Sequence, residues 1–252
     1  MKISYAITAH NEFDEIQKLI NILKSQLNSV SYDYEIIILD DYSSHPSMIA
    51  VLNDLAGKGV RNESHKLNNN FAEHKNFLSS LCKGDIIFQL DADEIPANRL
   101  IQGIASFFLA NPDVEVFNVP RVNIVNGITD KHIKQWGWKV SSTPQYKRRE
   151  RVNVESLGYT LLQENDLIMK QDQIIGSFAE VEYMLPIINW PDLQKRMWRN
   201  LSSIRWEGAV HETLVGWKTI GTLPLAMEFS ILHEKEIQKQ EQQNAMYSRI
   251  PR

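Results

Sequence analysis

The chain has 252 residues, of which 43% are hydrophobic and 23% charged, a balance that fits one large globular domain and excludes a disordered chain. A formal net charge of -4 gives no overall field that would attract nucleic acid or an anionic membrane surface. One cysteine, Cys82, excludes an internal disulfide framework. The first apolar run is too short for a secretion signal, and no stretch approaches the ~20 apolar residues of a membrane span. We therefore expect a cytoplasmic protein.

Strands and helices alternate through the first half of the chain. Apolar runs predict buried strands over residues 3–9, 35–39 and 85–90, with a more polar strand over 60–67. Apolar residues at helical spacing predict helices over 16–27, 48–55, 71–81 and 100–109. This order predicts an α/β fold with a Rossmann-like, mainly parallel sheet flanked by helices.

The pattern changes after about residue 113. Alternating valines predict a strand from 114 toward 125, whereas the stretch 128–186 looks irregular. That stretch contains Trp136, Trp138 and a basic run at 147–151. The charged, glutamine-rich tail at 234–252 predicts a surface helix. We find no internal repeat and no flexible linker.

Polar clusters end three of the predicted strands, at residues 8–11, 40–41 and 91–93. Ligands of parallel sheets bind beyond the carboxyl ends of the strands, so these clusters are expected on one rim. Asp91 and Asp93 suit a hard cation that also binds diphosphate oxygens and water. Such a pair is often a solvated turn, but its position directly after a buried strand favours a site.

The segments 8–12, 39–44 and 84–94 resemble, in order and spacing, the three signatures of the family-2 glycosyltransferases, which have the GT-A fold. Residues 190–196 and 206–212, with His233-Glu234-Lys235, are similar to a subgroup that includes lipopolysaccharide-core glucosyltransferases. The resemblance implies one GT-A domain. Residues 1–125 would form its donor-binding half. Residues 126–252 would form the acceptor-binding and catalytic half, with a smaller acceptor-side region and with a segment at about 128–186 that matches nothing.

The resemblance also implies a nucleotide pocket. Thr8 and Asn11 would line it, and Asp41 would accept a hydrogen bond from the base, which we expect to be uracil. Asp91 would lie near the ribose or a metal-bound water.

A metal site is implied beside this pocket. Asp93, with Asp91, would ligate the metal, His233 would complete the site, and Lys235 would neutralise the diphosphate. The alternative for His233 is a surface position at the start of a charged helix. Carboxylate, imidazole and phosphate ligands suit Mn²⁺ or Mg²⁺ better than zinc.

Sugar transfer needs a base that removes the proton of the acceptor hydroxyl. The resemblance places an acidic residue at about Glu212 and implies inversion at the anomeric carbon. The chain has His211-Glu212 where a Glu-Asp pair is commoner, so His211 is a second candidate. The structural alternative for Glu212 is an ion pair with Arg196 or Arg199.

The functional hypotheses differ mainly in the molecule that accepts the sugar. The subgroup resemblance favours a glycan or a lipid-linked glycan. The basic run at 147–151 beside aromatic residues would instead suit modified DNA, as in phage enzymes that glycosylate hydroxymethylated cytosine. A third hypothesis, from a different class, is a noncatalytic domain that binds a nucleotide or a sugar.

Overall fold

A long mixed sheet forms the centre of the molecule in the computed structural model, which describes residues 1–153, 174–175 and 178–247. The first four strands in the spatial order are β3 (Arg61–Ser64), β2 (Asp33–Asp40), β1 (Lys2–Ala9) and β4 (Ile86–Asp91). The order continues with β9 (Phe178–Arg199), β6 (Val116–Asn126), β13 (Ile231–Glu236) and β5 (Glu94–Pro96). The pairs among the first four strands, and the pair of β6 with β13, are parallel. The predicted α/β fold with a mainly parallel sheet is therefore confirmed.

The end of β9 joins the two parallel parts of the sheet. Residues Met197 and Trp198 pair antiparallel with β4 on one side and with β6 on the other. Since β4 and β6 both oppose β9, they run in the same direction, and their carboxyl ends face the same way. This insertion makes the late segment around residue 198 part of the central core.

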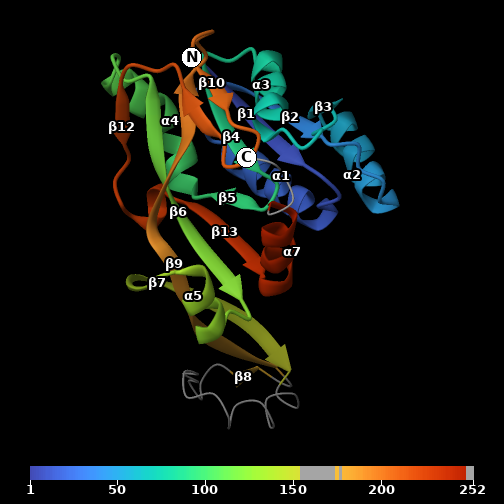
Figure 1. Ribbon diagram of the computed structural model, residues 1–252, viewed down its shortest axis with the longest axis vertical. Coiled ribbons are helices and arrows are strands. Elements are labelled where there is room, and N and C mark those ends of the chain that lie inside the picture. The colour runs from blue at the N-terminus through green and yellow to red at the C-terminus, as the bar shows by residue number, and fades with distance from the viewer. Residues whose placement is uncertain (154–173, 176–177, 248–252) are drawn as a thin grey trace.

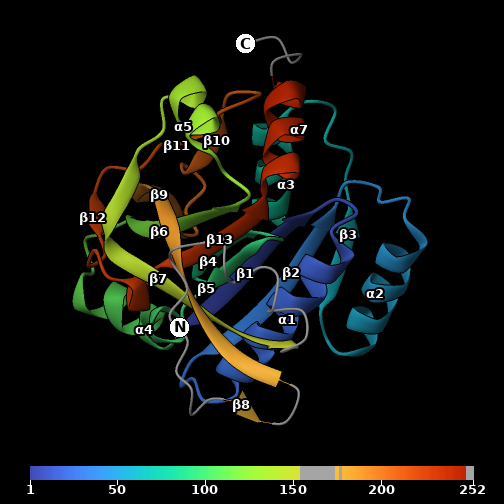
Figure 2. The ribbon, with the colours of Figure 1, turned by 90° about the horizontal axis from the view of Figure 1, so that it is seen from below.

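Helices cover both faces of the sheet (Figures 1 and 2). Alternate residues of a strand point to opposite faces, and β2 shows the consequence. Ile36 and Ile38 pack in the core beneath α1 (Phe13–Leu27) and α4 (Asn98–Ala110), whereas Ile37 and Leu39 pack beneath α3 (Phe71–Leu81). The helix α2 (Pro46–Gly57) contacts α1 and β3. Both faces of this part of the sheet are therefore buried, which explains the uninterrupted apolar runs of its strands.

The helices predicted in the first half are all present, and α3 has the predicted bounds. The tail differs from its prediction. Residues 234–236 complete strand β13, and the helix α7 (Ile237–Tyr247) begins only at Ile237. The strand forms because these residues pair with β6. The polar sequence of this segment does not predict that tertiary contact. Residues 248–252 of the predicted tail helix lie outside the described residues.

The prediction of an irregular segment at 128–186 is wrong for its described part. The short helix α5 (Asp130–Trp136) leads into β7 (Val140–Asn153), which pairs with β9 in a long antiparallel ladder. The ladder extends away from the body toward β8 (Ile174–Ile175), in the lower part of Figure 1. Its described side chains are mostly only partly buried, so the sequence lacks the apolar alternation by which a half-buried strand is recognised. Residues 154–173 and 176–177 of this segment lie outside the described residues.

The remaining elements are small. Strands β10 (Arg205–Glu207) and β11 (Thr213–Val215) form a separate hairpin that packs beside α3. Strand β12 (Ile220–Thr222) pairs with β6, and the short helix η2 (Met227–Phe229) leads into β13. Within the described part of the chain, no helix has the length and apolar character needed to cross a membrane.

Candidate functional site

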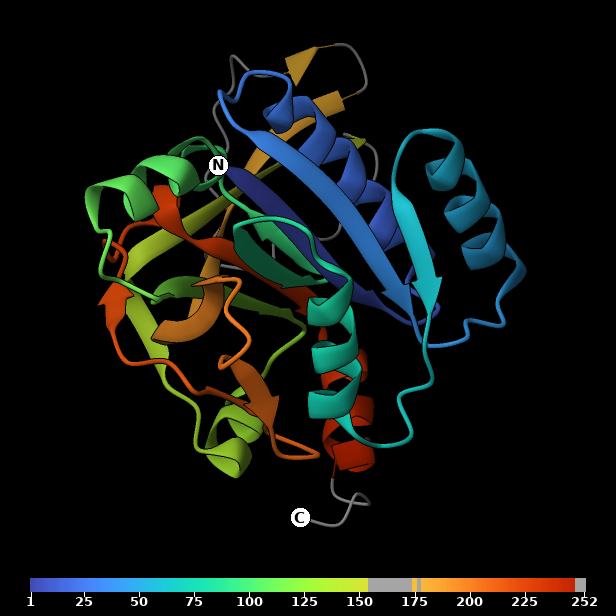
Figure 3. The same cartoon turned by 90° about the horizontal axis from the view of Figure 1, so that it is seen from above.

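The three polar clusters come together at the carboxyl edge of the sheet. The parallel register of β1 and β4 sets Thr8 opposite Asp91, and the Thr8 hydroxyl donates to Oδ1 of Asp91 over 3.0 Å. The backbone N–H of Asp41 donates to the carbonyl of Ala9 over 3.0 Å, which continues the ladder past the end of β2. In Figure 3, the arrowheads of β2 (blue) and β3 (cyan) lie at the same edge of the sheet.

The carboxylate of Asp91 is held on both oxygens. Gln89 also donates to Oδ1, over 3.1 Å, and Arg196 donates to Oδ2 over 2.7 Å. Burial raises the pKa of Asp91, but the charges of Arg196 and Lys75 outweigh it, so this pKa lies well below its usual range. Asp91 is therefore an anchored anion, and a metal would have to displace existing donors to bind it.

Glu94 is a residue that the sequence reasoning missed. Its side chain is fully buried, accepts from Arg196 over 2.5 Å and from Arg121 over 3.0 Å, and accepts the backbone N–H of Asp91 over 3.1 Å. Arg121 also pairs with Asp192 at 2.8 Å. Because each buried charge has a partner of opposite sign, this network holds the turn after β4 in place.

Asp93 and His233 face one another across the end of the sheet. His233 lies in β13, where it pairs with Glu94 of β5, and the distance from its Nε2 to Oδ2 of Asp93 is 3.6 Å. The Nδ1 atom of His233 lies 2.9 Å from Oδ1 of Asn123, an oxygen that only accepts, so Nδ1 carries the proton. The Nε2 atom of His233 faces the Asp93 carboxylate. A histidine that binds a metal commonly makes a hydrogen bond with its other ring nitrogen, as His233 does with Asn123.

The ligand atoms of Asp93 and His233 determine which metal ions these residues suit. The described residues contain no group of three or more histidine, cysteine, aspartate or glutamate side chains arranged to hold a metal ion. Asp93 and His233 alone provide an oxygen and a nitrogen ligand, and the other positions would belong to phosphate and water. This set fits Mn²⁺ or Mg²⁺ bound together with a diphosphate, and it does not fit a structural zinc.

Two lysines from the C-terminal part of the chain reach the same place. The ammonium of Lys239, in α7, lies 3.4 Å from Oδ2 of Asp93, and Lys235, in β13, donates to Gln243 over 3.0 Å. Burial lowers the pKa of Lys235 despite the nearby charge of Asp93. For Lys239, burial is outweighed by the charges of Asp93, Glu12 and Glu15, and its pKa is raised.

Glu212 lies beside α3 and is paired with a lysine that sequence reasoning missed. The ammonium of Lys75 lies 2.5 Å from Oε1 of Glu212 and 3.9 Å from Oδ1 of Asp91. It also lies over the ring of Trp206, 4.9 Å from the centroid. Lys75 is nearly buried, so this lysine connects the candidate base to the end of β4.

If Glu212 has only a structural role, its ion-pair partner is Lys75 and not the Arg196 or Arg199 that the sequence suggested. Arg196 pairs with Asp91 and Glu94 instead, and Arg199 donates to the carbonyls of Phe108, Asn111 and Val114. His211, the second candidate base, is exposed, and its backbone lies in the left-handed region with φ of 56°. The structure thus places Glu212 in contact with the charge network.

The residues expected to line a nucleotide pocket gather at the ends of β1 and β2. The amide oxygen of Asn11 accepts from the backbone N–H groups of Ser44 and His45, so Asn11 holds the loop after β2. Asp41 accepts the backbone N–H of Leu67 over 2.8 Å and remains partly exposed. Thr8, by contrast, is committed to Asp91.

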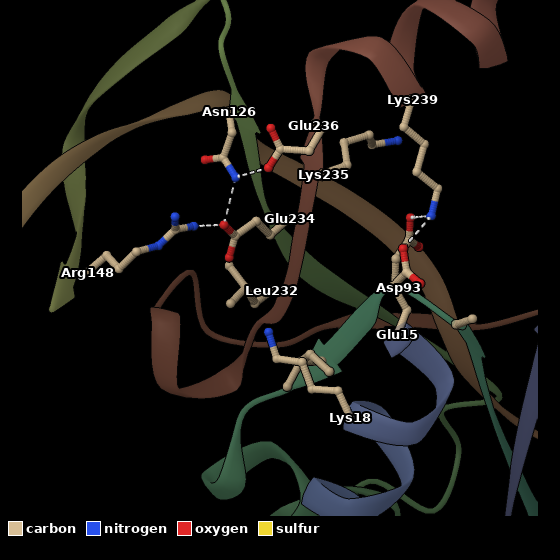
Figure 4. Close-up of a pocket in the computed structure, with 12 residues that line it drawn as sticks. Glu15, Lys18, Asp93, Asn126, Arg148, Leu232, Glu234, Lys235, Glu236 and Lys239 are labelled. Atoms are coloured by element: carbon tan, nitrogen blue, oxygen red, sulfur yellow. Dashed lines mark hydrogen bonds and ion pairs between the residues drawn. The ribbon is translucent and has the colours of Figure 1, made fainter. Parts of the chain in front are cut away.

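A cavity of about 470 Å³ opens next to Asp93, on the side of α1 (Figure 4). Its walls come from α1, β5, β13, α7 and the β7 ladder. The charged and amide side chains that line it are Glu15, Lys18, Asp93, Asn126, Arg148, Glu234, Lys235, Glu236 and Lys239. Asp93 therefore belongs both to the turn that follows β4 and to the wall of this cavity.

A sequence model of glycosyl transferase family 2 matches residues 4–164, which is more than half of the chain. The chain therefore belongs to glycosyl transferase family 2. The likeness to solved structures supports the predicted GT-A fold. The structure of residues 1–349 of TarS from S. aureus aligns with a TM-score of 0.53 and 12% identity, covering 93% of this chain and 60% of that one. The same protein in complex with UDP-GlcNAc aligns with a TM-score of 0.52 and 13% identity, covering 93% and 59%.

The curated relatives resemble only part of the chain. An undecaprenyl-phosphate 4-deoxy-4-formamido-L-arabinose transferase from Pseudomonas fluorescens (strain SBW25) is 30% identical over 111 residues, covering 41% of this chain and 32% of the relative. The protein of the same name from Edwardsiella ictaluri (strain 93-146) is 31% identical over 108 residues, covering 40% and 33%. The matched region thus spans about a third of the length of these relatives.

Proposed function

We propose that the chain is a metal-dependent, inverting glycosyltransferase that moves a sugar from a UDP-sugar to a hydroxyl group of a glycan or a lipid-linked glycan. The observation that carries the proposal is the approach of Asp93 Oδ2 and His233 Nε2 to 3.6 Å at the carboxyl edge of the sheet. Ligands of parallel sheets bind at this edge. Membership of glycosyl transferase family 2 supports the reaction class.

In this proposal the donor nucleotide lies over the ends of β1, β2 and β4. Asp41 accepts a hydrogen bond from the base, and Asn11 shapes the pocket by holding the loop at Ser44. Asp91 is directed to the ribose by Thr8 and Arg196. The complex of TarS with UDP-GlcNAc, which has the same fold, supports a uridine nucleotide as the first choice.

Asp93 and His233 would hold Mn²⁺ or Mg²⁺, with Asp91 as a less available ligand because its oxygens already accept hydrogen bonds. When bound, the metal stabilises the negative charge that develops on the leaving diphosphate. Lys235 adds a largely buried positive charge on the same side, where a phosphate oxygen would be a better partner than the amide of Gln243.

Glu212 is the proposed base. Its carboxylate would exchange Lys75 for the acceptor hydroxyl, take the hydroxyl proton, and let the oxygen attack the anomeric carbon. The bond from that carbon to the diphosphate oxygen breaks as the new bond forms on the opposite face, so the configuration inverts. His211 remains the alternative base.

The choice of acceptor rests on two observations. The curated relatives carry undecaprenyl phosphate in their names, which supports a lipid-linked acceptor. The described cations of the basic run that suggested modified DNA are engaged in ion pairs. Glu182 pairs with Lys147 at 2.9 Å and with Arg149 at 3.1 Å, and Arg148 pairs with Glu234. The side chain of Arg151 lies outside the described residues.

The decisive first measurement is the melting temperature with UDP, GDP, CDP and ADP, each with and without Mn²⁺. A ligand at 100 times its Kd stabilises a protein by about 2.7 kcal/mol, which raises the melting temperature by roughly 5 °C or more. We expect a Mn²⁺-dependent shift with UDP that Asp93→Asn abolishes while the unliganded protein melts as before. A lack of any shift would favour the noncatalytic hypothesis and remove the donor site.

Transfer itself needs a separate assay. Release of UDP from UDP-sugars with a lipid-linked glycan, a neutral glycan or hydroxymethylated duplex DNA as acceptor would distinguish the three acceptor classes. A UDP-dependent thermal shift without UDP release from any UDP-sugar would support a binding domain instead.

A further inference from the structure

The ammonium of Lys239 lies among three carboxylates. Its Nζ atom is 3.1 Å from Oε1 of Glu12, 3.2 Å from Oε1 of Glu15 and 3.4 Å from Oδ2 of Asp93. Glu12 and Glu15 belong to the start of α1, Asp93 follows β4, and Lys239 belongs to the C-terminal helix α7. Figure 4 shows the contacts of Lys239 with Asp93 and Glu15. Lys239 is thus a cation that the chain itself brings to the edge of the sheet.

The contact with Asp93 uses the oxygen that faces His233. Oδ2 of Asp93 is 3.6 Å from Nε2 of His233 and 3.4 Å from Nζ of Lys239. A divalent cation bound between Asp93 and His233 would draw on the same oxygen and would be repelled by the neighbouring ammonium. The divalent cation and the Lys239 ammonium therefore cannot both bind closely to Oδ2 of Asp93.

The three carboxylates carry more negative charge than Lys239 balances. Burial raises the pKa of Glu12, and the charge of Asp93 adds to that rise although Lys239 opposes it. The carboxylates therefore repel one another when only one ammonium lies among them. If Lys239 leaves Asp93, Glu12 and Glu15 still offer it two partners on α1.

We propose that Lys239 is a positioning residue that competes with the divalent cation for Asp93, so that cation binding moves the Lys239 ammonium off Asp93 and onto Glu12 and Glu15. The inference rests on the proposed metal role of Asp93 and His233. It assigns to the helix α7 a part in the donor site that the strand signatures do not indicate.

The test measures the Mn²⁺ dissociation constant of the full chain without nucleotide, from the electron paramagnetic resonance signal of free Mn²⁺. Lys239→Met should bind Mn²⁺ about five- to tenfold more tightly than the wild type, because it removes a partly exposed competing charge. Lys239→Arg, which keeps the charge, should stay within about twofold of the wild type. Lys18→Met is the matched control, since Lys18 lines the same cavity and forms no ion pair with a described carboxylate.

Amine labelling provides a second, direct measurement on the wild-type protein. Acetylation by an N-hydroxysuccinimide ester, read by mass spectrometry, should increase at Lys239 when saturating Mn²⁺ is added. Acetylation of Lys18 should stay constant in the same sample and serves as the internal control.

The outcomes separate this inference from the proposed function. An Mn²⁺ affinity of Lys239→Met that equals or falls below the wild-type value would overturn the competition, as would constant labelling of Lys239. Mn²⁺ binding that survives Asp93→Asn would overturn the metal assignment and the inference with it. The donor site is judged independently, by the shift in melting temperature that UDP produces.

Discussion

The two aspartates that follow β4 differ in what surrounds them. Asp91 accepts from Thr8, Gln89 and Arg196, so its charge is fixed in the protein network. Among the described residues, the ion pairs of Asp93 are those with His233 and Lys239, at 3.6 and 3.4 Å. Two residues of the same type, separated by one residue in the sequence, are therefore suited to different tasks.

The pairing of Glu212 with Lys75 makes a prediction about catalysis. Glu212→Gln keeps the shape of the side chain but cannot accept the hydroxyl proton, so kcat should fall by roughly 10²–10⁴-fold. The affinity for UDP should be unchanged, because Glu212 contacts Lys75 and not the residues of the nucleotide pocket. Steady-state kinetics with titration of UDP checks both expectations.

His211→Asn is the matched control, because His211 is the other candidate base. If this variant loses activity while Glu212→Gln keeps it, the roles of the two residues are reversed. Equal losses in both variants would point to a shared contribution of the loop that carries them.

Arg196 is expected to be critical for stability. It has 4% of its side chain exposed, and Arg196→Met would leave Asp91 and Glu94 facing each other without their shared cation. We expect a loss of about 3–5 kcal/mol in the free energy of unfolding, measured by urea denaturation. Arg205→Met, which breaks the exposed pair with Glu207, should stay within about 0.5 kcal/mol of the wild type.

The lowered pKa of Asp91 predicts a dependence of stability on pH. A carboxyl group whose pKa is lower in the folded than in the unfolded chain stabilises the fold above the unfolded value, about 3.9 for aspartate. That contribution is lost as the pH falls through the lower, folded value. Arg196→Met, which lacks the main cause of the lowering, should therefore lose less stability between pH 5 and 2 than the wild type. An equal loss in both proteins would mean that Arg196 does not set this pKa.

At this scale the sequence predicts which residue types lie at the edge of the sheet but not how they pair. Asp91, Asp93 and His233 were found from strand ends and from a family resemblance. Lys75 and Glu94 were missed, because a buried lysine and a buried glutamate look like ordinary surface residues until their partners are known. The partner of Lys75 is 137 positions away, and no local spacing reveals it.

At the scale of elements, the start of β4 is tightly fitted against β1. A Cβ atom added at Gly84 would lie 2.7 Å from the backbone nitrogen of Ser4 and 2.9 Å from the carbonyl oxygen of Lys2. Gly84→Ala should therefore push the two strands apart and cost about 1–3 kcal/mol of unfolding free energy. Thermal and urea unfolding would measure the loss.

The control for this change is Gly57→Ala at the end of α2. No atom lies within 4 Å of a Cβ added there, and alanine favours a helix, so stability should stay equal or rise by up to about 1 kcal/mol. If both alanine variants behaved alike, the close approach at Gly84 would not limit stability.

The elements divide clearly into those that the sequence predicts and those that it does not. The predicted bounds of the helix α3 match the structure, in which Asn70 caps its start and the chain leaves the helix before Gly84. The ladder of β7 and β9 was missed. Its stability comes from backbone pairing over a long distance in the chain, and its side chains show no clear separation into an inner and an outer face.

At the scale of the whole molecule, the sheet depends on a segment from the second half of the chain. Without residues 197–199, β4 loses its antiparallel neighbour, and β6 loses part of its pairing along the same side. A fragment of residues 1–126 is therefore expected to expose the open edge of β4 and both edges of β6, and to aggregate. Fractionation after expression checks this expectation, with the full chain as the control, and a soluble, cooperatively unfolding fragment would contradict it.

The placement of β9 also bears on how the protein is made. A ribosome completes β1, β2, β3 and β4 early, and their parallel pairing can begin at once because each new strand lies beside one already made. The open side of β4 must wait until residues 197–199 have been synthesised. During that interval the unpaired, apolar edge of β4 is exposed in the nascent chain. We expect this edge to be the part of the nascent chain that depends most on binding by a chaperone.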